Sequence, residues 1–206
     1  MTKVFRYTRG DLVILFNGDG YDYCYSIEDF TKKQITFLRT KTSPSYIPQQ
    51  KITLCLSVIK KDNVELVVQK ATELGVTTII PILTSRSEKK NLSHDRLRKI
   101  AIESAEQCGR GDIPDVQEVT SLKKSLATLT PDQYGLFFNM GGAPFSSIKQ
   151  FFKHKELILF IGPEGGFSDE DIILMKEHGL KECSLGKTVL RAETAAITCV
   201  ALSTIL

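Results

Sequence analysis

The stretch KITLCLSVIKKDNVELVVQKATELGVTTIIPIL, residues 51–83, decides the fold class. Apolar residues alternate along 51–58, which predicts a strand, and recur at helical spacing along 62–74, which predicts a helix. Residues 77–83 are apolar and rich in β-branched side chains, so a second strand is expected there. A strand, a helix and another strand in this order are typical of a parallel sheet with helices on its faces.

The same alternation continues to the end of the sequence. Further helices are predicted at 95–108, 168–178 and 193–206, and further strands at 134–139, 156–161 and 182–185. Ser168 and Asp171 have the spacing of a capping box, which marks the start of the second of these helices. We therefore expect an α/β domain with a largely parallel sheet.

The first 45 residues follow a different pattern. Strands are predicted at 12–16, 21–27 and 34–38, and the turn sequence NGDG, residues 17–20, separates the first two. Residues 40–50, which are rich in proline and serine, are expected to form a linker. A segment this short is not expected to build a stable core of its own.

Composition excludes several classes of protein. The net charge is +3 and 42% of the residues are hydrophobic, which are ordinary values for a globular protein. The charge-free stretch 195–206 is shorter than the roughly 18–20 apolar residues of a membrane span. Charged residues at Lys3, Arg6, Arg9 and Asp11 interrupt any apolar run of a signal peptide. We expect a cytoplasmic protein with no membrane partner.

The cysteines and histidines show no ligand spacing. Five scattered cysteines contain no CxxC pair, and the three histidines are far apart in the sequence. This pattern fits neither a zinc site nor a disulfide framework, and it favours a reducing compartment. We expect no metal, and we interpret the thiols as small buried side chains.

Two glycine-bearing segments follow predicted strands in the last third of the chain. They are IGPEGGF, residues 161–167, and LGKTVLRAETAAI, residues 185–197. Ligands of open α/β sheets bind beyond the carboxyl ends of the strands, so both segments are candidate binding loops. The glycines allow a ligand to approach the backbone closely, and a Cβ at Gly165 is expected to enter the pocket.

Known nucleotide-binding motifs fail in both segments. Gly186-Lys187-Thr188 is similar to the end of a P-loop, but Lys181 stands where the first glycine is required. Pro163 and Glu164 spoil a dinucleotide fingerprint, because an acid beside a pyrophosphate is unfavourable. The GxSxG motif of hydrolases is absent. From the residues alone, ligand-binding turns and purely structural turns stay equally open.

Four segments together resemble the RsmE family of SPOUT-class methyltransferases, which methylate N3 of a uridine in small-subunit ribosomal RNA. They occur in the family order and are ELVVQKATELGV (65–76), AEQCGR (105–110) followed by Pro114, IGPEGGFSDED (161–171) and LGKTVLRAETA (185–195).

The resemblance implies a fold, a cofactor and partners. The fold is an α/β SPOUT domain at 51–206 with a deep C-terminal trefoil knot. It is preceded by a linker at 46–50 and by a PUA-like, RNA-binding β-barrel at 1–45 that looks truncated against the family pattern. The implied cofactor is S-adenosylmethionine, and the implied partner is the 16S RNA of the small ribosomal subunit. Two copies are expected to pair as a homodimer that completes the active site.

The resemblance also implies site residues. The cofactor pocket would be lined by three loops: Phe138, Asn139, Ile161, Gly162, Pro163, Glu164, Gly165, Gly166, Leu185, Gly186, Val189, Leu190, Thr194 and Ala195. Arg191 is the first catalytic candidate, because a guanidinium stabilises the negative charge that develops on uracil when N3 loses its proton. Holding a phosphate is the other functional role open to Arg191, and the structural alternative is an ion pair with Glu164 or Glu193. Glu193 is either a helix cap or a proton acceptor, and capping is favoured.

RNA contacts are expected from basic and polar residues. Residues 86–99 hold six basic residues and two acids, which suits phosphate binding, although a solvated helix face is the alternative. The family pattern adds polar residues on two helices. The full RNA-binding set is Arg6, Arg9, Gln69, Lys70, Glu73, Arg86, Lys89, Lys90, Arg96, Gln107 and Arg110.

Two other functions stay open. One is a related SPOUT enzyme that methylates a ribose 2′-hydroxyl or another RNA. The other is a non-catalytic RNA-binding protein of ribosome assembly, against which the intact glycine segments, Arg191 and Glu193 argue.

Overall fold

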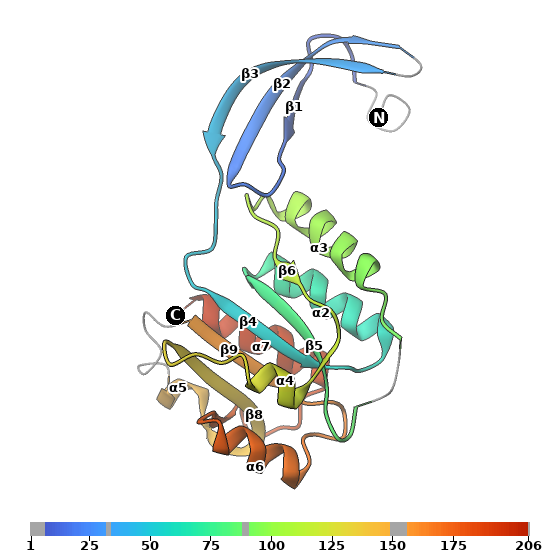
Figure 1. Ribbon diagram of the computed structural model, residues 1–206. Helices are drawn as coiled ribbons and strands as arrows, with labels where there is room; N and C mark the ends of the chain where they lie inside the picture. Colours follow the sequence, from blue (N-terminus) through green and yellow to red (C-terminus); the bar gives the residue numbers. More distant parts are fainter. Residues whose placement is uncertain (1–6, 32–33, 88–90, 149–155, 206) are drawn as a thin grey trace. The chain divides into compact units, whose positions relative to one another are not determined.

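The computed structural model describes residues 7–31, 34–87, 91–148 and 156–205, and they form two compact units (Figure 1). The first unit holds the described residues up to Ile47 together with Ala105–Asp112, and the second holds the rest. The continuous helical pattern of 95–108 gives no sign of this division. Among the expected RNA-binding residues, Arg6, Lys89 and Lys90 lie outside the described residues.

The first unit contains a three-stranded antiparallel sheet. It consists of β1 (Leu12–Leu15), β2 (Tyr21–Phe30) and β3 (Ile35–Pro44), in that order. The NGDG turn joins β1 to β2, and Gly18 and Gly20 there take positive φ angles of 84° and 90°. The expected linker is wrong in its first part, because β3 continues to Pro44, which pairs with Tyr21. Proline is tolerated there because it ends the strand.

The second unit is built on a parallel sheet. Its strands are β4 (Ile52–Ser57), β5 (Thr78–Leu83), β6 (Asp115–Val116), β7 (Thr120–Ser121), β8 (Gln133–Pro144), β9 (Glu156–Ile161) and β10 (Lys181–Ser184). The order is β10-β8-β9-β4-β5-β6, β7 also pairs with β5, and all pairs are parallel. The α/β class with a parallel sheet is therefore confirmed.

Helices cover both faces of this sheet (Figure 1). Helices α2 (Lys61–Glu73), α3 (His94–Cys108) and α7 (Ala192–Ile205) share one apolar core with alternate strand residues such as Leu54 and Leu159. Helices α4 (Leu122–Leu126) and α6 (Asp169–Glu177) share the other core with residues such as Cys55 and Phe160. Neighbouring strand residues thus point to opposite cores, which is why β4 is buried along its whole length and β9 is buried after its first residue. A short helix, α5 (Phe145–Ile148), follows β8.

Local signals fix where the helices begin and end. The predicted capping box is confirmed, because the Ser168 hydroxyl accepts from the Asp171 N–H and the Asp171 carboxylate accepts from the Ser168 N–H. Helix α2 ends at Glu73, and Gly75, two residues later, has a φ of 95°, which favours glycine. There the N–H of Val76 bonds to the carbonyl of Ala71, as in a Schellman motif.

Strand β8 is interrupted where it pairs with β10. Glu182 pairs with Phe137, but the next residue, Cys183, pairs with Ala143. Residues 138–142 therefore leave the ladder, and we call them the β8 loop. Gly142 closes the loop against β10, where an added Cβ would lie 2.4 Å from the carbonyl carbon of Cys183. The sequence pattern predicted a strand only to residue 139 and did not reveal this loop. None of the described helices has both the length and the apolar character needed to span a bilayer.

Candidate functional site

A cavity of about 460 Å³ lies at the carboxyl ends of β8, β9 and β10, three neighbours in the sheet. Its size falls in the range of small-molecule sites, roughly 300–1,000 Å³. Three loops build its walls: the β8 loop, the glycine loop (residues 162–167) and the β10–α7 loop (residues 185–191). They meet because parallel strands end at the same edge of the sheet.

The structure brings together nearly all residues of the expected cofactor pocket. Thirteen of the fourteen line the cavity, and Thr194 is the exception, being exposed on α7. Sequence reasoning missed Met140, Ser184, Thr188 and Ala192, which also line it. Each of these four residues is adjacent in the sequence to a predicted residue. This adjacency is the one signal that would have found them. Contact of any of these residues with a cofactor stays a prediction.

The β8 loop is held by a network behind the pocket wall. The Asn139 amide donates to Glu182 Oε1 at 2.9 Å, and the Asn139 oxygen accepts from the N–H of Met140. Lys176 Nζ lies 2.8 Å from Glu182 Oε2. The hydrogen bond from Lys176, and then that from Asn139, lower the pKa of the Glu182 carboxyl. The Asn139 side chain therefore shapes the loop with both of its polar ends.

This network gives a stability prediction. We expect Glu182→Ala to lower the free energy of unfolding by about 1 kcal/mol at neutral pH, because Asn139 and Lys176 lose a charged partner. Since the folded-state pKa of Glu182 is lowered, the contribution is full above the usual pKa of 4.5 and is lost as the pH falls through the lowered value. Urea denaturation at neutral and acidic pH measures both effects. Glu177→Ala, which removes an exposed carboxylate, is the control; equal losses for the two variants would contradict the prediction.

The glycine loop is held from outside by Arg86, in the turn after β5. Arg86 Nη1 donates to the carbonyl oxygens of Gly165 at 2.8 Å and Phe167 at 3.4 Å. A Cβ added at Gly165 would meet Arg86 Cδ at 3.6 Å, an ordinary contact distance. The nearest neighbour of such a Cβ is thus the Arg86 side chain, and its entry into the pocket that Gly165 lines stays a prediction.

The β10–α7 loop is held by its own strand. The Ser184 hydroxyl donates to the Gly186 carbonyl at 2.9 Å and lies 3.2 Å from the Gly186 N–H, which donates to it. Gly186 has a φ of 139°, in the region that favours glycine. This loop ends at Arg191, which lines the pocket and is exposed.

Arg191 and Glu193 are placed differently. Among the described residues, no carboxylate lies within ion-pair distance of Arg191, so the alternative pairs with Glu164 and Glu193 do not form. Glu193 lies in the first turn of α7 and is absent from the pocket wall as the structure describes it. Its position favours stabilisation of the helix dipole, whereas Arg191 lines the pocket and has no ionic partner among the residues that the structure describes.

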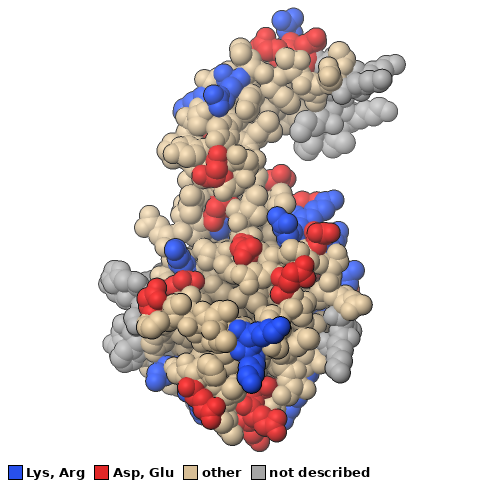
Figure 2. Space-filling model, viewed as in Figure 1, with Lys and Arg blue, Asp and Glu red and all other residues tan. Residues whose placement is uncertain are grey.

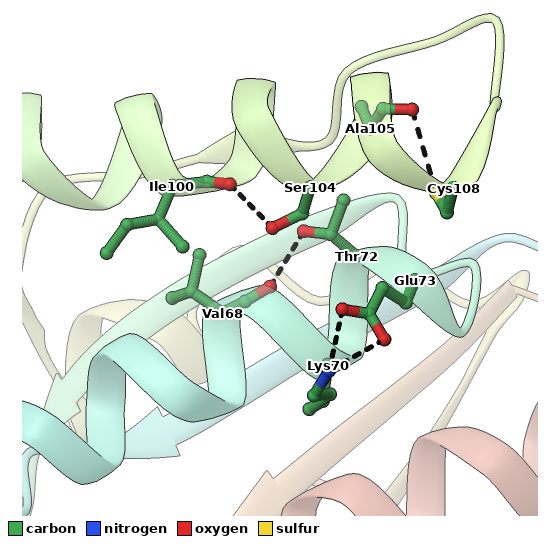
Figure 3. Close-up of polar contacts among 8 residues, drawn as sticks. All are labelled: Val68, Lys70, Thr72, Glu73, Ile100, Ser104, Ala105 and Cys108. Atoms are coloured by element: carbon green, nitrogen blue, oxygen red, sulfur yellow. Dashed lines mark hydrogen bonds and ion pairs between the residues drawn. The ribbon is translucent and has the colours of Figure 1, made fainter.

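Several expected RNA contacts are occupied by acidic partners. Lys70 Nζ lies 2.8 Å from Glu73 Oε1 on α2 (Figure 3), and Arg96 Nη2 lies 2.9 Å from Glu65 Oε2. Arg110 is 4% exposed and forms a two-pronged pair with Asp112, at 2.9 and 2.7 Å. Burial corrects the expectation for Arg110, whose fork holds its own chain segment instead of facing RNA. Arg9, Gln69 and Gln107 are exposed.

The surface charge is mixed on the face drawn in Figure 2. There, blue lysine and arginine side chains are interspersed with red acidic ones, with no continuous basic surface among the coloured residues. Phosphate binding on that face would therefore involve separate cations. Arg86 Nη1 donates to the glycine loop, but the side chain is exposed, so its expected role as a phosphate contact stays a prediction.

The cysteine side chains differ in burial. Cys55, Cys183 and Cys199 are buried, and desolvation raises the pKa of Cys183 to about 12. Cys108 is exposed and contacts the carbonyl of Ala105 one helical turn back (Figure 3). Within the described parts of the chain, no group of three His, Cys, Asp or Glu side chains is arranged to hold a metal ion.

Comparisons with known proteins agree with this geometry. A family model described as an RNA methyltransferase domain matches residues 45–204. Ribosomal RNA small subunit methyltransferase E of Rickettsia conorii is 30% identical over 96% of this chain and 82% of its own length, and that of Bacillus subtilis is 29% identical with the same coverage.

Two solved structures share the fold. A putative methyltransferase from Legionella pneumophila, solved with bound S-adenosylmethionine, has a TM-score of 0.89 and 32% identity, over 99% of this chain and 86% of that one. Ribosomal RNA small subunit methyltransferase E from Neisseria gonorrhoeae, also bound to S-adenosylmethionine, has a TM-score of 0.88 and 25% identity, over 98% and 85%. With its cavity at the carboxyl ends of β8, β9 and β10, the chain belongs to the RNA methyltransferase family that includes ribosomal RNA small subunit methyltransferase E.

Proposed function

We propose that this protein is an S-adenosylmethionine-dependent methyltransferase that methylates N3 of a uridine in 16S ribosomal RNA. The observation that carries the proposal is the cavity of about 460 Å³, whose walls are the loops that the family resemblance assigns to the cofactor. Matches over nearly the whole chain to proteins named ribosomal RNA small subunit methyltransferase E support it.

The residues of the cavity fit the cofactor. Glycines at 162, 165 and 166 leave backbone groups accessible, as recognition of an adenine edge requires, and Leu185, Val189 and Leu190 supply apolar surface for the ring. The Glu164 carboxylate lies in the same wall and would favour a cationic ligand. When bound, S-adenosylmethionine supplies an electrophilic methyl group on a positively charged sulfur.

Arg191 is proposed as the group that acts on the substrate base. Uracil N3 becomes nucleophilic when its proton leaves, and negative charge then spreads onto the two carbonyl oxygens of the ring. The Arg191 guanidinium is always protonated and donates in a fixed fork, so it stabilises this charge as it develops. Its place in the pocket wall, with no ionic partner among the described side chains, leaves it available for that role.

The finer architecture is part of the proposal. We propose a trefoil knot through β8, β9 and β10, a linker at 46–50, and an RNA-binding PUA-like unit at 1–45 of which the sheet β1-β2-β3 is the described part.

We also propose a homodimer. The large apolar side chains Val189 and Met140, 83% and 48% exposed beside the pocket, support it, because a second copy would cover them. The site of action is the cytoplasm, where small-subunit RNA is found.

The decisive experiment is methylation of small-subunit RNA from a bacterial strain that lacks its own RsmE activity. We expect methyl transfer from S-adenosylmethionine and the appearance of 3-methyluridine in nucleoside mass spectrometry. A ribose-methylated nucleoside instead would identify a related SPOUT enzyme. Cofactor binding without any methylation of free RNA or assembled subunits would identify a non-catalytic assembly protein and overturn the proposal.

A further inference from the structure

The turn after β5 makes two polar connections to the segment after β9. Arg86 bonds the carbonyls of Gly165 and Phe167 in the glycine loop. The neighbouring Ser85 hydroxyl donates to Asp171 Oδ1 at 2.9 Å, and the Ser85 N–H donates to Asp171 Oδ2 at 3.3 Å. Asp171 is 6% exposed and also caps α6. The glycine loop and the helix that follows it are thus both tied to this turn.

The turn itself is rigid enough to act as an anchor. Thr84 and Ser87 hold it with three hydrogen bonds: hydroxyl to hydroxyl at 2.9 Å, Thr84 N–H to Ser87 Oγ at 3.0 Å, and Ser87 N–H to the Thr84 carbonyl at 3.1 Å. It begins directly at the end of β5, an inner strand of the sheet. Arg86 therefore projects from a fixed base.

The glycine loop needs such a support. Glycines at 162, 165 and 166 give its backbone more freedom than other residues would, and a pocket wall loses affinity when it must be ordered on binding. One internal hydrogen bond, from the Gly166 N–H to the Pro163 carbonyl at 2.8 Å, closes its turn. Arg86 Nη1 adds bonds to two further carbonyls, and the aliphatic part of Arg86 packs beside the bare Cα of Gly165.

We propose that Arg86 is a positioning residue that holds the glycine loop in the conformation that binds the methyl donor. It acts from outside the pocket, since it is not among the residues that line the cavity. The inference rests on the proposed function and adds to it a residue that the sequence pattern assigned to RNA phosphates.

The test compares Arg86→Lys and Arg86→Ala with the wild-type protein. Lysine keeps the positive charge that a phosphate contact needs, but its side chain is one bond shorter and has no guanidinium Nη1 to reach the two carbonyls. We expect both variants to bind S-adenosylmethionine about ten-fold more weakly in calorimetry without RNA, the effect of losing one hydrogen bond from a charged donor. Their kcat at saturating cofactor is expected to stay near the wild-type value, with KM for the cofactor raised and KM for RNA unchanged.

Two further measurements keep the outcomes separate. Hydrogen exchange at the Gly166 amide should be faster in both Arg86 variants than in the wild-type protein. Arg98 is an exposed cation on α3, and the control variants Arg98→Lys and Arg98→Ala should leave cofactor affinity and this exchange unchanged. Wild-type cofactor affinity in Arg86→Lys would overturn the inference, and a loss of RNA affinity in Arg86→Ala alone would return Arg86 to a phosphate contact. If the wild-type protein itself fails to bind the cofactor, the proposed function fails instead.

Discussion

Replacing Arg191 with alanine is expected to lower kcat for methyl transfer about 10²–10³-fold, the usual cost of removing a donor to a developing oxyanion. Folding should be unaffected, because the side chain is exposed and has no ionic partner among the described residues. Affinity for S-adenosylmethionine should change little, because the proposed partner of the guanidinium is the substrate base and not the cofactor. Single-turnover methylation and calorimetry measure the two quantities separately.

Lys187→Ala is the matched control for Arg191. Lys187 is an exposed cation in the same β10–α7 loop, but it does not line the cavity. Its removal should leave the single-turnover rate within a few-fold of wild type. Equal losses in the two variants would show that loop charge matters rather than the position of the guanidinium. A near-normal rate in Arg191→Ala would remove its catalytic role.

Replacing Gly142 with alanine should have the largest effect on stability, a loss of about 3 kcal/mol in the free energy of unfolding. The added Cβ would lie 2.4, 2.5 and 2.6 Å from backbone atoms of Cys183 in β10, and a strand backbone cannot swing aside as a flexible side chain can. Either β10 separates from β8 or the β8 loop moves away. In both cases the pocket wall is displaced, so cofactor affinity should fall together with stability.

Gly141→Ala provides the control at the adjacent position. Its Cβ would lie 3.4 Å from Glu182 Oε1, a side-chain atom that can adjust, and neither glycine has a positive φ. The two substitutions therefore differ in available space and not in backbone strain. Urea denaturation should show a loss below about 1 kcal/mol for Gly141→Ala. Comparable losses at both positions would contradict the structural account.

The sequence predicted the helices and strands that are long enough to show a periodic pattern of apolar residues. The alternation in 51–58 and the helical spacing in 62–74 correspond to β4 and α2, with each end shifted by one residue. The two-residue strands β6 and β7 and the five-residue helix α4 were missed, because such short elements contain no full period. The end of β3 was mistaken for a linker because Pro44 and its flanking serines have a turn-like composition.

The candidate site was predicted unevenly for a physical reason. Glycine segments after strands mark where a ligand can approach, so residues 161–166 and most of the β10–α7 loop were found. The residues that hold those loops in place from outside the pocket have no comparable sequence signal. Arg86 bonds to carbonyl groups, which every residue possesses, and within a basic segment it is indistinguishable from a phosphate contact. The Arg110–Asp112 pair was likewise hidden, since burial cannot be seen in the residue type alone.

The step in pairing between β8 and β10 also has an evolutionary consequence. Glu182 and Cys183 are consecutive residues, and they pair with Phe137 and Ala143, which flank residues 138–142. These two pairs hold the two ends of the β8 loop at a fixed separation. Residues inserted or deleted between these two ends would lengthen or shorten one wall of the pocket while every other strand keeps its register. The protein can thus acquire a differently shaped recognition surface by changing the length of a single segment, without redesigning the scaffold that carries it.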